Sequence, residues 1–264
     1  MTPMDLNGRT ALVTGGAQGL GEAMVRALAD AGAKVVIADI QDDLGAKLAE
    51  TLGEGHGFVH LDVTDDVSWS AAMASAVAEL GGLDILVNNA GVEITSLLVD
   101  LDPDQARTML DINVLGTALG IKHAFRTMRP GGAVGNGGTI INIASVAATI
   151  AFPAISIYSA TKSAIDRLTR VASMESGKLG YGVRVNCVYP GLVPNRMGAG
   201  LAADVARIGL FPSTEEAVNA VVGLTPSGRL ASPEDIADAV VFLASDKSAF
   251  VNGAGLPVDG GMGM

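Results

Sequence analysis

The sequence of 264 residues has little of several features that would each point to a particular class of protein. It holds one cysteine, Cys187, which excludes an intramolecular disulfide. Because Cys187 lies in the apolar run RVNCVYP, we interpret it as a small buried residue and not as a reactive thiol. The three histidines, His56, His60 and His123, are scattered, and no cysteine, histidine and carboxylate cluster has metal-ligand spacing. We therefore expect no metal site.

Positive charge and long apolar segments are also scarce. The chain has 17 Lys and Arg against 28 Asp and Glu, and a net charge of −11 argues against a nucleic-acid partner. Apolar runs such as TIINIASVAATIAF are broken by polar residues and are too short to span a bilayer. The first residues, MTPMDLNGRTALVTGG, lack the basic and apolar regions of a signal peptide. We expect a soluble, cytoplasmic protein with no membrane partner.

Apolar and small residues are abundant, and they alternate in a regular pattern. Hydrophobic residues make up 49% of the chain, enough for a large core. Short β-branched runs alternate with helical patterns, which predicts an α/β fold: one Rossmann-type domain over 1–264, with a doubly wound parallel sheet and helices on both faces. The predicted strands are 10–14, 34–38, 57–60, 85–88, 138–143 and 182–188. The predicted helices are 20–31, 42–52, 65–80, 103–128 and 159–178, with another from Pro233.

Residues 190–228 depart from this alternation. The segment carries four prolines and separates the last predicted strand from the helix at Pro233. A connection of this length in a compact domain is usually functional. We predict an apolar lid over a substrate site, formed by Leu192, Met197, Leu201, Ile208, Leu210 and Phe211.

The first predicted strand runs into TGGAQGLG, residues 14–21, and a helix follows at once. Glycines at Gly15, Gly19 and Gly21 permit a tight turn and a close approach of the backbone to a pyrophosphate at the helix N-terminus. Loops between strands and helices often need glycine, so the pattern alone is weak. Here the strand before it, the helix after it and an acidic residue further along make it a prediction of dinucleotide binding.

That acidic residue is Asp39, at the end of the second predicted strand in VVIADI. A carboxylate there accepts hydrogen bonds from both ribose hydroxyls and repels a 2′-phosphate. Neither Gln18 nor Ile40 supplies a cation for such a phosphate, so we favour NAD over NADP. The alternative is that Asp39 only caps the next turn. Asp62, which ends the third strand, can meet an adenine amino group, and the small residues of NNAG (88–91) let a dinucleotide lie against the backbone.

Together these motifs resemble those of the short-chain dehydrogenase/reductase family, over essentially the whole chain. The order and spacing of so many elements make the resemblance specific. The residues that carry it are TGGAQGLG, Asp39, Asp62, NNAG, Asn113 in LDINVLGT, Ser145 in INIASV, Tyr158 and Lys162 in YSATKSA, and Pro190 with Gly191.

The resemblance implies four catalytic residues. Tyr158 would be the acid/base, and Lys162, one helical turn further, would lower its pKa from about 10 and hold the nicotinamide ribose. Ser145 would hydrogen-bond the substrate oxygen, and Asn113 would kink its helix and position a water that relays protons to Lys162. Taken alone, Tyr158 and Lys162 would indicate a solvated helix face, Ser145 a helix cap and Asn113 a structural residue.

The resemblance also implies which residues bind the cofactor. One departure from the family pattern follows them, because Pro194 is inserted and Asn195 stands where a threonine usually contacts the nicotinamide carboxamide. Asparagine can make similar hydrogen bonds, so this contact stays open. The implied cofactor residues are Gly15, Gln18, Gly19, Leu20, Gly21, Asp39, Ile40, Asp62, Val63, Asn89, Ala90, Gly91, Tyr158, Lys162, Pro190, Gly191 and Val193.

The apolar lid and the apolar run VAATIAFPAI predict a hydrophobic alicyclic or steroid-like alcohol or ketone as substrate, unless these residues are buried against a neighbouring subunit. Arg196 is the single candidate to bind a substrate anion, and Glu93 is a candidate polar contact. Fragments such as DVTDDVSW are similar to those of bacterial hydroxysteroid and alicyclic alcohol dehydrogenases.

Two other functions stay open. One is an NADPH-dependent 3-oxoacyl reductase, although such enzymes carry basic residues near the glycine loop. The other is a catalytically silent NAD(H)-binding sensor, against which the intact catalytic set argues. The resemblance further implies a homotetramer, with the apolar run SAFVNGAGLPVDGGMGM docking between subunits.

Overall fold

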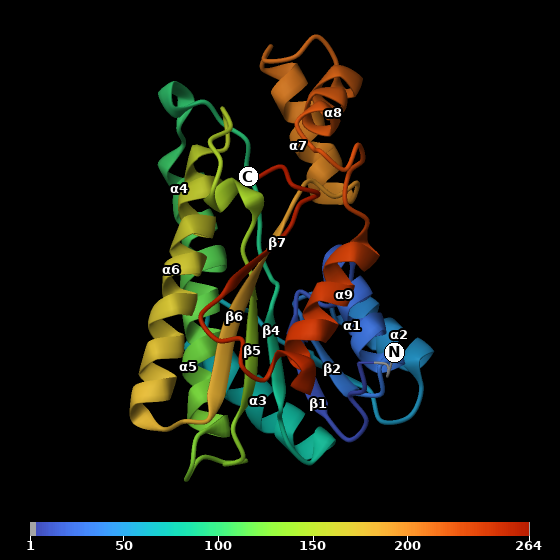
Figure 1. The fold of residues 1–264 in the computed structure, drawn as a ribbon, viewed down its shortest axis with the longest axis vertical. Helices are drawn as coiled ribbons and strands as arrows, with labels where there is room; N and C mark the ends of the chain where they lie inside the picture. Colours follow the sequence, from blue (N-terminus) through green and yellow to red (C-terminus); the bar gives the residue numbers. More distant parts are fainter. Residues whose placement is uncertain (1–3, 264) are drawn as a thin grey trace.

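A seven-stranded parallel sheet organises the chain, whose computed structural model describes residues 4–263 (Figure 1). The strand order is β3-β2-β1-β4-β5-β6-β7, so the direction of winding reverses between β1 and β4. Ligands of such sheets bind outside the carboxyl ends of the strands at this reversal. The strands are β1 (Thr10–Thr14), β2 (Lys34–Asp39), β3 (Gly57–His60), β4 (Ile85–Asn88), β5 (Gly138–Ile143), β6 (Val183–Pro190) and β7 (Gly255–Val258).

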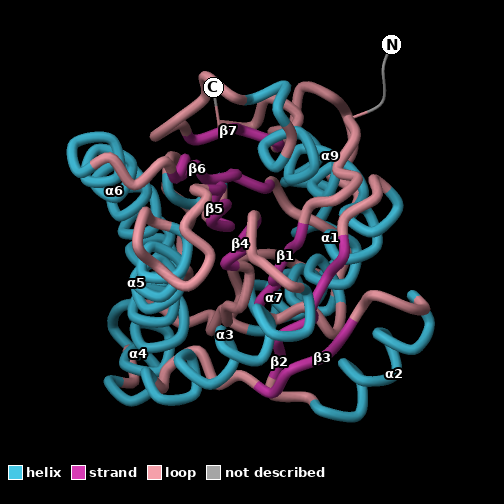
Figure 2. The backbone as a smooth tube through the Cα atoms, turned by 90° about the horizontal axis from the view of Figure 1, so that it is seen from below, coloured by secondary structure: helices cyan, strands magenta, loops and turns pink. Residues whose placement is uncertain are grey.

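Helices cover both faces of the sheet (Figure 2). One face carries α1 (Gly19–Asp30), α2 (Asp42–Leu52) and α9 (Pro233–Ala244). The other carries α3 (Asp66–Leu80), α4 (Pro103–Met109), α5 (Gly116–Met128) and α6 (Ser156–Leu179). Short helical turns occur at η1 (Leu98–Asp100), η3 (Val146–Ala148) and η4 (Asp246–Ser248). The predicted single-domain, doubly wound α/β fold is confirmed.

The two cores lie on opposite faces of the strands, as the apolar runs require. Leu12 and Val13 are adjacent in β1 and both fully buried, Leu12 in the core under α3 and α5, and Val13 in the core under α1 and α9. Burying such a side chain stabilises the fold by about 1.5–3 kcal/mol. Cys187 on β6 is also fully buried, as predicted.

Three elements differ from the sequence predictions. The helix expected over 103–128 is interrupted by η2 (Leu110–Leu115), a π-helical turn between α4 and α5. The segment 190–228 is not an extended loop, because it contains α7 (Arg196–Arg207) and α8 (Thr214–Gly223). Part of the apolar C-terminal run forms β7, which pairs with β6, so its apolar character has a cause within the chain.

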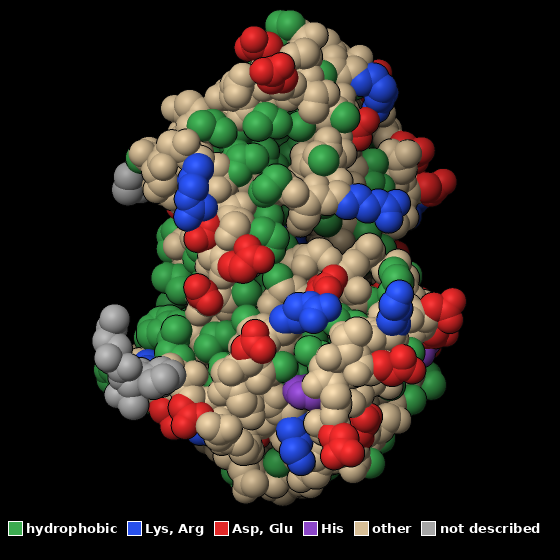
Figure 3. All heavy atoms as spheres, turned by 90° about the vertical axis from the view of Figure 1, so that its right-hand side faces the viewer, with side chains coloured by type: hydrophobic (Ala, Val, Ile, Leu, Met, Phe, Trp, Pro, Cys, Tyr) green, Lys and Arg blue, Asp and Glu red, His purple; other side chains and the backbone are tan. Residues whose placement is uncertain are grey.

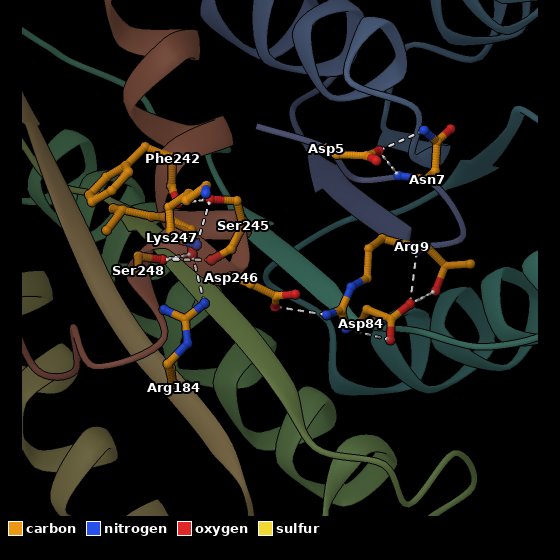
Figure 4. A network of polar contacts seen from close by, with 12 residues as sticks. Asp5, Asn7, Arg9, Asp84, Arg184, Phe242, Ser245, Asp246, Lys247 and Ser248 are labelled. Carbon is orange, nitrogen blue, oxygen red and sulfur yellow. Dashed lines mark hydrogen bonds and ion pairs between the residues drawn. The ribbon is translucent and has the colours of Figure 1, made fainter. Parts of the chain in front are cut away.

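Polar contacts hold the amino ends of the strands (Figure 4). These are the ends opposite to the carboxyl ends, where ligands of such sheets bind. Arg9, which precedes β1, pairs with Asp84 at 3.7 Å and with Asp246 at 2.9 Å. The backbone and hydroxyl of Thr10 donate to the Asp84 carboxylate at 2.9 and 2.8 Å. Arg184 on β6 donates to the carbonyls of Leu243 and Val251. The amino ends of the strands are therefore held in place by hydrogen bonds and ion pairs.

Two kinds of feature are absent from residues 4–263. No helix there is long and apolar enough to cross a membrane. No group of three or more histidine, cysteine and acidic side chains in that range has the geometry to hold a metal ion.

Candidate active site

A cleft of about 960 Å³ opens at the carboxyl ends of the strands. Figure 3 shows hydrophobic side chains gathered around the hollow between the upper part of the molecule, which contains α7 and α8, and the lower body. With the exception of Asn113, every residue for which the sequence predicts a catalytic or cofactor role lines this cleft. They are Gly15, Gln18, Gly19, Leu20, Gly21, Asp39, Ile40, Asp62, Val63, Asn89, Ala90, Gly91, Ser145, Tyr158, Lys162, Pro190, Gly191 and Val193.

The glycine loop between β1 and α1 is shaped by backbone contacts. Gly15 and Gly19 both have φ of 60°, in the left-handed region that favours glycine. A Cβ on Gly21 would overlap the carbonyl oxygen of Gly15, whereas one on Gly19 would meet nothing within 4 Å. The Asn89 amide donates to the carbonyls of Thr14 and Gly15 at 2.9 and 3.0 Å. The result is a fixed cradle with open space above Gly19, at the N-terminus of α1, where an anion is stabilised.

Asp39 lies buried at the end of β2, beside this loop. One carboxylate oxygen accepts the Ala17 N–H at 3.0 Å, and the other accepts the backbone and side-chain N–H of Gln41 at 3.1 and 3.2 Å. A carboxylate has roughly four acceptor positions, so these three bonds leave about one for a ligand. Asp39 thus caps the following turn, as the alternative reading proposed, and still faces the cleft. Its neighbour Ile40 is 63% exposed.

Tyr158 and Lys162 come from the first turns of α6, and Ser145 comes from the end of β5. The Lys162 ammonium nitrogen donates to the Ile143 carbonyl at 2.8 Å and lies 5.5 Å from the centre of the Tyr158 ring. Ser145 accepts the Ala147 N–H at 3.1 Å and so begins η3, and its side chain lies close enough to Tyr158 to lower the pKa of that phenol. The three side chains therefore meet at one point of the cleft wall.

Burial dominates the proton affinities at this point. It raises the pKa of Tyr158 to about 12, although the Ser145 hydrogen bond acts in the opposite direction, and the charge of Glu93 raises that pKa further. Burial lowers the pKa of Lys162 to about 8. The expectation that Lys162 brings the Tyr158 pKa toward neutrality is therefore not met here. The reason is that removing a phenolate from water raises its pKa by more than the hydrogen bond with Ser145 lowers it.

Asn113 lies behind the cleft wall, fully buried in η2. Its side chain accepts the Val92 N–H at 2.8 Å and donates to the Val92 carbonyl at 2.9 Å and to the Thr161 hydroxyl at 3.0 Å. A Cβ on Gly91 would lie 3.2 Å from the side-chain oxygen of Asn113 and 3.6 Å from the Lys162 ammonium nitrogen. Asn113 therefore ties the NNAG turn to α6 next to Lys162. The π-helical turn is a local distortion of the kind often found at functional sites.

Three further residues line the cleft: one whose contact was left open, one that was predicted as a polar contact, and one that sequence reasoning missed. Asn195 lines the cleft, but its side-chain oxygen accepts the Gly198 N–H at 2.9 Å and caps α7. Glu93 also lines the cleft, and burial raises the pKa of its carboxyl group. Met262 lines the cleft as well and was missed. The sequence feature that could have indicated Met262 is the glycine-rich turn DGGMGM. Its position next to the cleft follows only from the pairing of β7 with β6.

A parallel sheet that reverses its winding above a glycine cradle, with a half-buried tyrosine and a buried lysine and serine nearby, defines the class of dinucleotide-dependent oxidoreductases. A protein family described as Enoyl-(Acyl carrier protein) reductase matches residues 15–263. Trans-4-hydroxycyclohexanecarboxylate dehydrogenase of Sinomonas cyclohexanicum is 40% identical, over 96% of this chain and 92% of its own. The 3-alpha-(or 20-beta)-hydroxysteroid dehydrogenase of Mycobacterium tuberculosis is 38% identical, over 97% of this chain and 90% of its own.

The solved structures agree with these sequence relatives. A gluconate 5-dehydrogenase from Burkholderia cenocepacia, in complex with NADP and tartrate, is 33% identical, with a TM-score of 0.86 and coverage of 98% of this chain and 97% of its own. The chain therefore belongs to the short-chain dehydrogenase/reductase family. It is an oxidoreductase that binds a nicotinamide dinucleotide cofactor.

Proposed function

We propose that this chain is an NAD(H)-dependent dehydrogenase that interconverts a hydrophobic secondary alcohol, alicyclic or steroid-like, and its ketone. The observation that carries the proposal is the meeting of Tyr158, Lys162 and Ser145 in a cleft that also contains the glycine cradle. The relatives described above support the same reaction class, since two are named as dehydrogenases of ring-bearing alcohols.

The residues present fit a dinucleotide. The open space above Gly19 would take a pyrophosphate against backbone N–H groups, and Asp39 would keep an acceptor for a ribose hydroxyl. Pro190, Gly191 and Val193 at the end of β6 would contact the nicotinamide end. When bound, the cofactor supplies a hydride acceptor or donor.

The chain's own residues hold and move the proton. With a pKa of about 12, Tyr158 is a neutral phenol at neutral pH and can donate its proton to a ketone oxygen. Ser145 donates to the same oxygen as negative charge develops there. Lys162 carries a positive charge below a pH of about 8 and supports the Tyr158 oxygen once its proton has left. Asn113 positions the Lys162 ammonium group through its hydrogen bonds to Val92 and to Thr161, the neighbour of Lys162. Alcohol oxidation returns the proton to the Tyr158 oxygen.

The choice of NAD over NADP is supported by the charges around Asp39. Among the described residues that line the cleft, the only lysine and arginine are Lys162 and Arg196. Lys162 is committed to the Ile143 carbonyl and the Tyr158 ring, and Arg196 begins α7. A 2′-phosphate beside Asp39 would therefore meet a carboxylate and no cation.

The substrate class is supported by the lining of the rest of the cleft. Apolar residues from η3, from the loop after it and from 190–228 face it, which would exclude water from an apolar ring. Phe152 stacks on Phe211 with ring centres 6.3 Å apart, which joins the loop to α7 and α8 in a small apolar cluster. We propose that these two helices form the lid. The apolar residues of this lining are Val146, Ile150, Phe152, Ile155, Leu192, Met197, Leu201, Val221 and Met262.

Absorbance of the reduced nicotinamide tests the proposal, with NAD⁺ and with NADP⁺, against cyclohexanol and a 3-hydroxysteroid. We expect turnover with NAD⁺, and a loss of about 10²–10⁴-fold in Tyr158→Phe with NADH binding retained. Preference for NADP⁺ would contradict the role of Asp39. That preference combined with turnover of a 3-oxoacyl thioester would favour the 3-oxoacyl reductase, which, like the enzyme in the description of the matching family, acts on an acyl thioester. NADH binding without turnover of any substrate would favour the sensor.

The oligomeric state and the location stay predictions. Val171 on α6 and Leu179 at its end are 48% and 59% exposed, and Phe250, just before β7, is fully exposed. We propose that such residues are covered in a homotetramer. Analytical ultracentrifugation measures this directly.

A further inference from the structure

The chain after β7 does not leave the molecule but turns back across the cleft. In Figure 1 it runs in red from β7 toward α7 and α8, and its end lies between these helices and the upper end of α6. Residues 259–263, which we call the C-terminal turn, are described in full, and Met262 among them lines the cleft.

The turn is built around a buried carboxylate. Asp259 is 7% exposed, and its two oxygens accept the N–H groups of Gly261 and Gly263, both at 2.9 Å. Gly260 and Gly261 have φ of 65° and 89°, which other residues adopt with difficulty. The Met262 N–H also donates to the Asp259 carbonyl at 3.3 Å. The backbone on both sides of Met262 is thus fixed by one side chain.

The C-terminal turn contacts three separate segments, two of which line the cleft. At its start, a Cβ on Gly191 would lie 3.0 Å from the Asp259 Cα, so the turn packs directly against the end of β6. In its middle, the Gly260 carbonyl accepts the backbone and hydroxyl of Ser227, which follows α8, at 3.0 and 3.1 Å.

At its end, the turn reaches the segment that follows Ser145. A Cβ on Gly263 would lie 3.1 Å from the Val146 side chain and 3.1 Å from the Thr149 hydroxyl. The C-terminal turn therefore spans from the proposed nicotinamide end of the cleft to the residues next to Ser145. Whatever occupies the space between Ser145 and the lid lies against it.

We propose that the C-terminal turn is a wall of the substrate site, with Met262 as a specificity-determining residue and Asp259 as the residue that positions it. This inference rests on the proposed function and deepens it by naming what limits the size of the alcohol. A methionine is unbranched and adaptable, so it can close around a single ring or fold aside for a larger one. One methylene more or less in such a pocket alters discrimination between substrates by about 10–200-fold.

The first arm of the test measures kcat/KM for a 3-hydroxysteroid and for cyclohexanol in wild type, Met262→Ala and Met262→Phe. We expect the steroid-to-cyclohexanol ratio to rise at least tenfold in Met262→Ala and to fall at least tenfold in Met262→Phe, with the effect in KM. Met174→Ala is the matched control, because Met174 is 73% exposed on α6 and does not line the cleft. If the Met262 variants keep the ratio of this control, the inference is wrong and the proposed function stands.

The second arm separates this inference from the proposed reaction. Calorimetry measures binding of the same steroid to each variant with NADH present. If Met262→Phe binds the steroid at least tenfold more weakly than wild type, and no alcohol is oxidised, Met262 is part of the binding-site wall but the proposed alcohol oxidation is wrong. A wild type that neither binds nor oxidises the steroid or cyclohexanol would overturn both.

Asp259→Asn tests the positioning role. It keeps the shape of the side chain but turns one acceptor into an N–H₂ group that faces a backbone N–H, so the turn must rearrange. We expect the size selectivity to change in the same direction as in Met262→Ala, with NADH affinity within threefold of wild type. A loss of NADH binding without a change in selectivity would show that Asp259 only supports Gly191 and would contradict the assigned role.

Discussion

The two halves of the cleft are built in different ways. The glycine half, residues 14–21, 39–41, 62–63 and 89–91, is shaped mainly by backbone, with hydrogen bonds such as that from Asn89 to Gly15 holding each loop. The apolar half, residues 146–155, 192–221 and 259–263, is shaped by side chains from η3, from α7 and α8 and from the C-terminal turn. A backbone surface admits few residue types, whereas a side-chain surface admits many. We therefore expect the sequence of the glycine half to be restricted by cofactor binding, and the apolar half to be able to change with the substrate.

The strongest way to break the glycine half is Gly21→Ala. The new Cβ would overlap the Gly15 carbonyl and lie 2.8 Å from the Asn89 amide nitrogen, and backbone cannot yield as a flexible side chain would. Hydrogen bonds to a charged group contribute about 1.5–3 kcal/mol each, so losing two to the pyrophosphate weakens binding by about 3 kcal/mol or more. We expect the Kd for NADH, measured by fluorescence titration, to rise at least a hundredfold.

Gly177→Ala is the control for this change. Gly177 is also helical, and a Cβ there would meet nothing within 4 Å. Alanine in a helix is favoured over glycine by about 1 kcal/mol, so this variant should be slightly stabilised and bind NADH as wild type does. Equal NADH affinity in the two variants would mean that the glycine cradle is not the cofactor site.

The same contrast explains what the sequence predicted. Six of the strands followed from apolar runs and the glycine cradle from its spacing and context, whereas the set around Tyr158 followed from the family resemblance. The structure brings the cradle together with Tyr158, Lys162 and Ser145 in one cleft. The helices within 190–228 were missed because four prolines and many small residues mask their periodicity, although Asn195 and Ser213 cap them in the ordinary way.

Other features depended on contacts between distant segments. The distortion of the helix at Asn113 was expected from the family resemblance alone, because no local pattern reveals the bonds that Asn113 makes to the backbone of Val92, twenty-one positions away. β7 is four residues long and only partly buried, so its apolar pattern is too short to recognise. The pKa of Tyr158 was misjudged because the depth of burial is a property of the folded chain.

Lys162 lies in the cleft between the two halves, and its burial makes the free energy of unfolding depend on pH. Burial lowers the pKa of Lys162 from 10.5 to about 8. Between these values the unfolded chain binds the proton and the folded chain does not, so the free energy of unfolding rises with pH there, by about 3 kcal/mol in total at 1.4 kcal/mol per pKa unit. Below about pH 8 both states bind the proton, and the buried charge destabilises the fold in full.

Lys162→Met removes this titration. We expect wild type to gain about 3 kcal/mol in unfolding free energy relative to the variant as pH rises from 7 to above 10, measured by urea denaturation. The phenol of Tyr158 titrates in the opposite sense, because its raised pKa makes stability fall from about pH 10 upward, but it is present in both proteins. A difference that stays constant with pH would show that Lys162 is not held in an apolar environment.

The smallest expected effect lies in the apolar half, at Ala154. It is the only non-glycine residue among those the structure describes with a positive φ, 68°, and it precedes Ile155, which lines the cleft, and the start of α6. Its carbonyl accepts the Ser96 N–H at 2.8 Å, and that bond survives in Ala154→Gly. The left-handed conformation costs alanine about 1–2 kcal/mol, and glycine costs about 0.5–1 kcal/mol of extra chain entropy, so we expect a net stabilisation of about 0.5–1 kcal/mol in urea denaturation.

Ala160→Gly, in the regular part of α6, should be destabilised by about 1 kcal/mol instead. If both variants lose stability equally, Ala154 is not strained, and the apolar half holds its catalytic helix by packing alone.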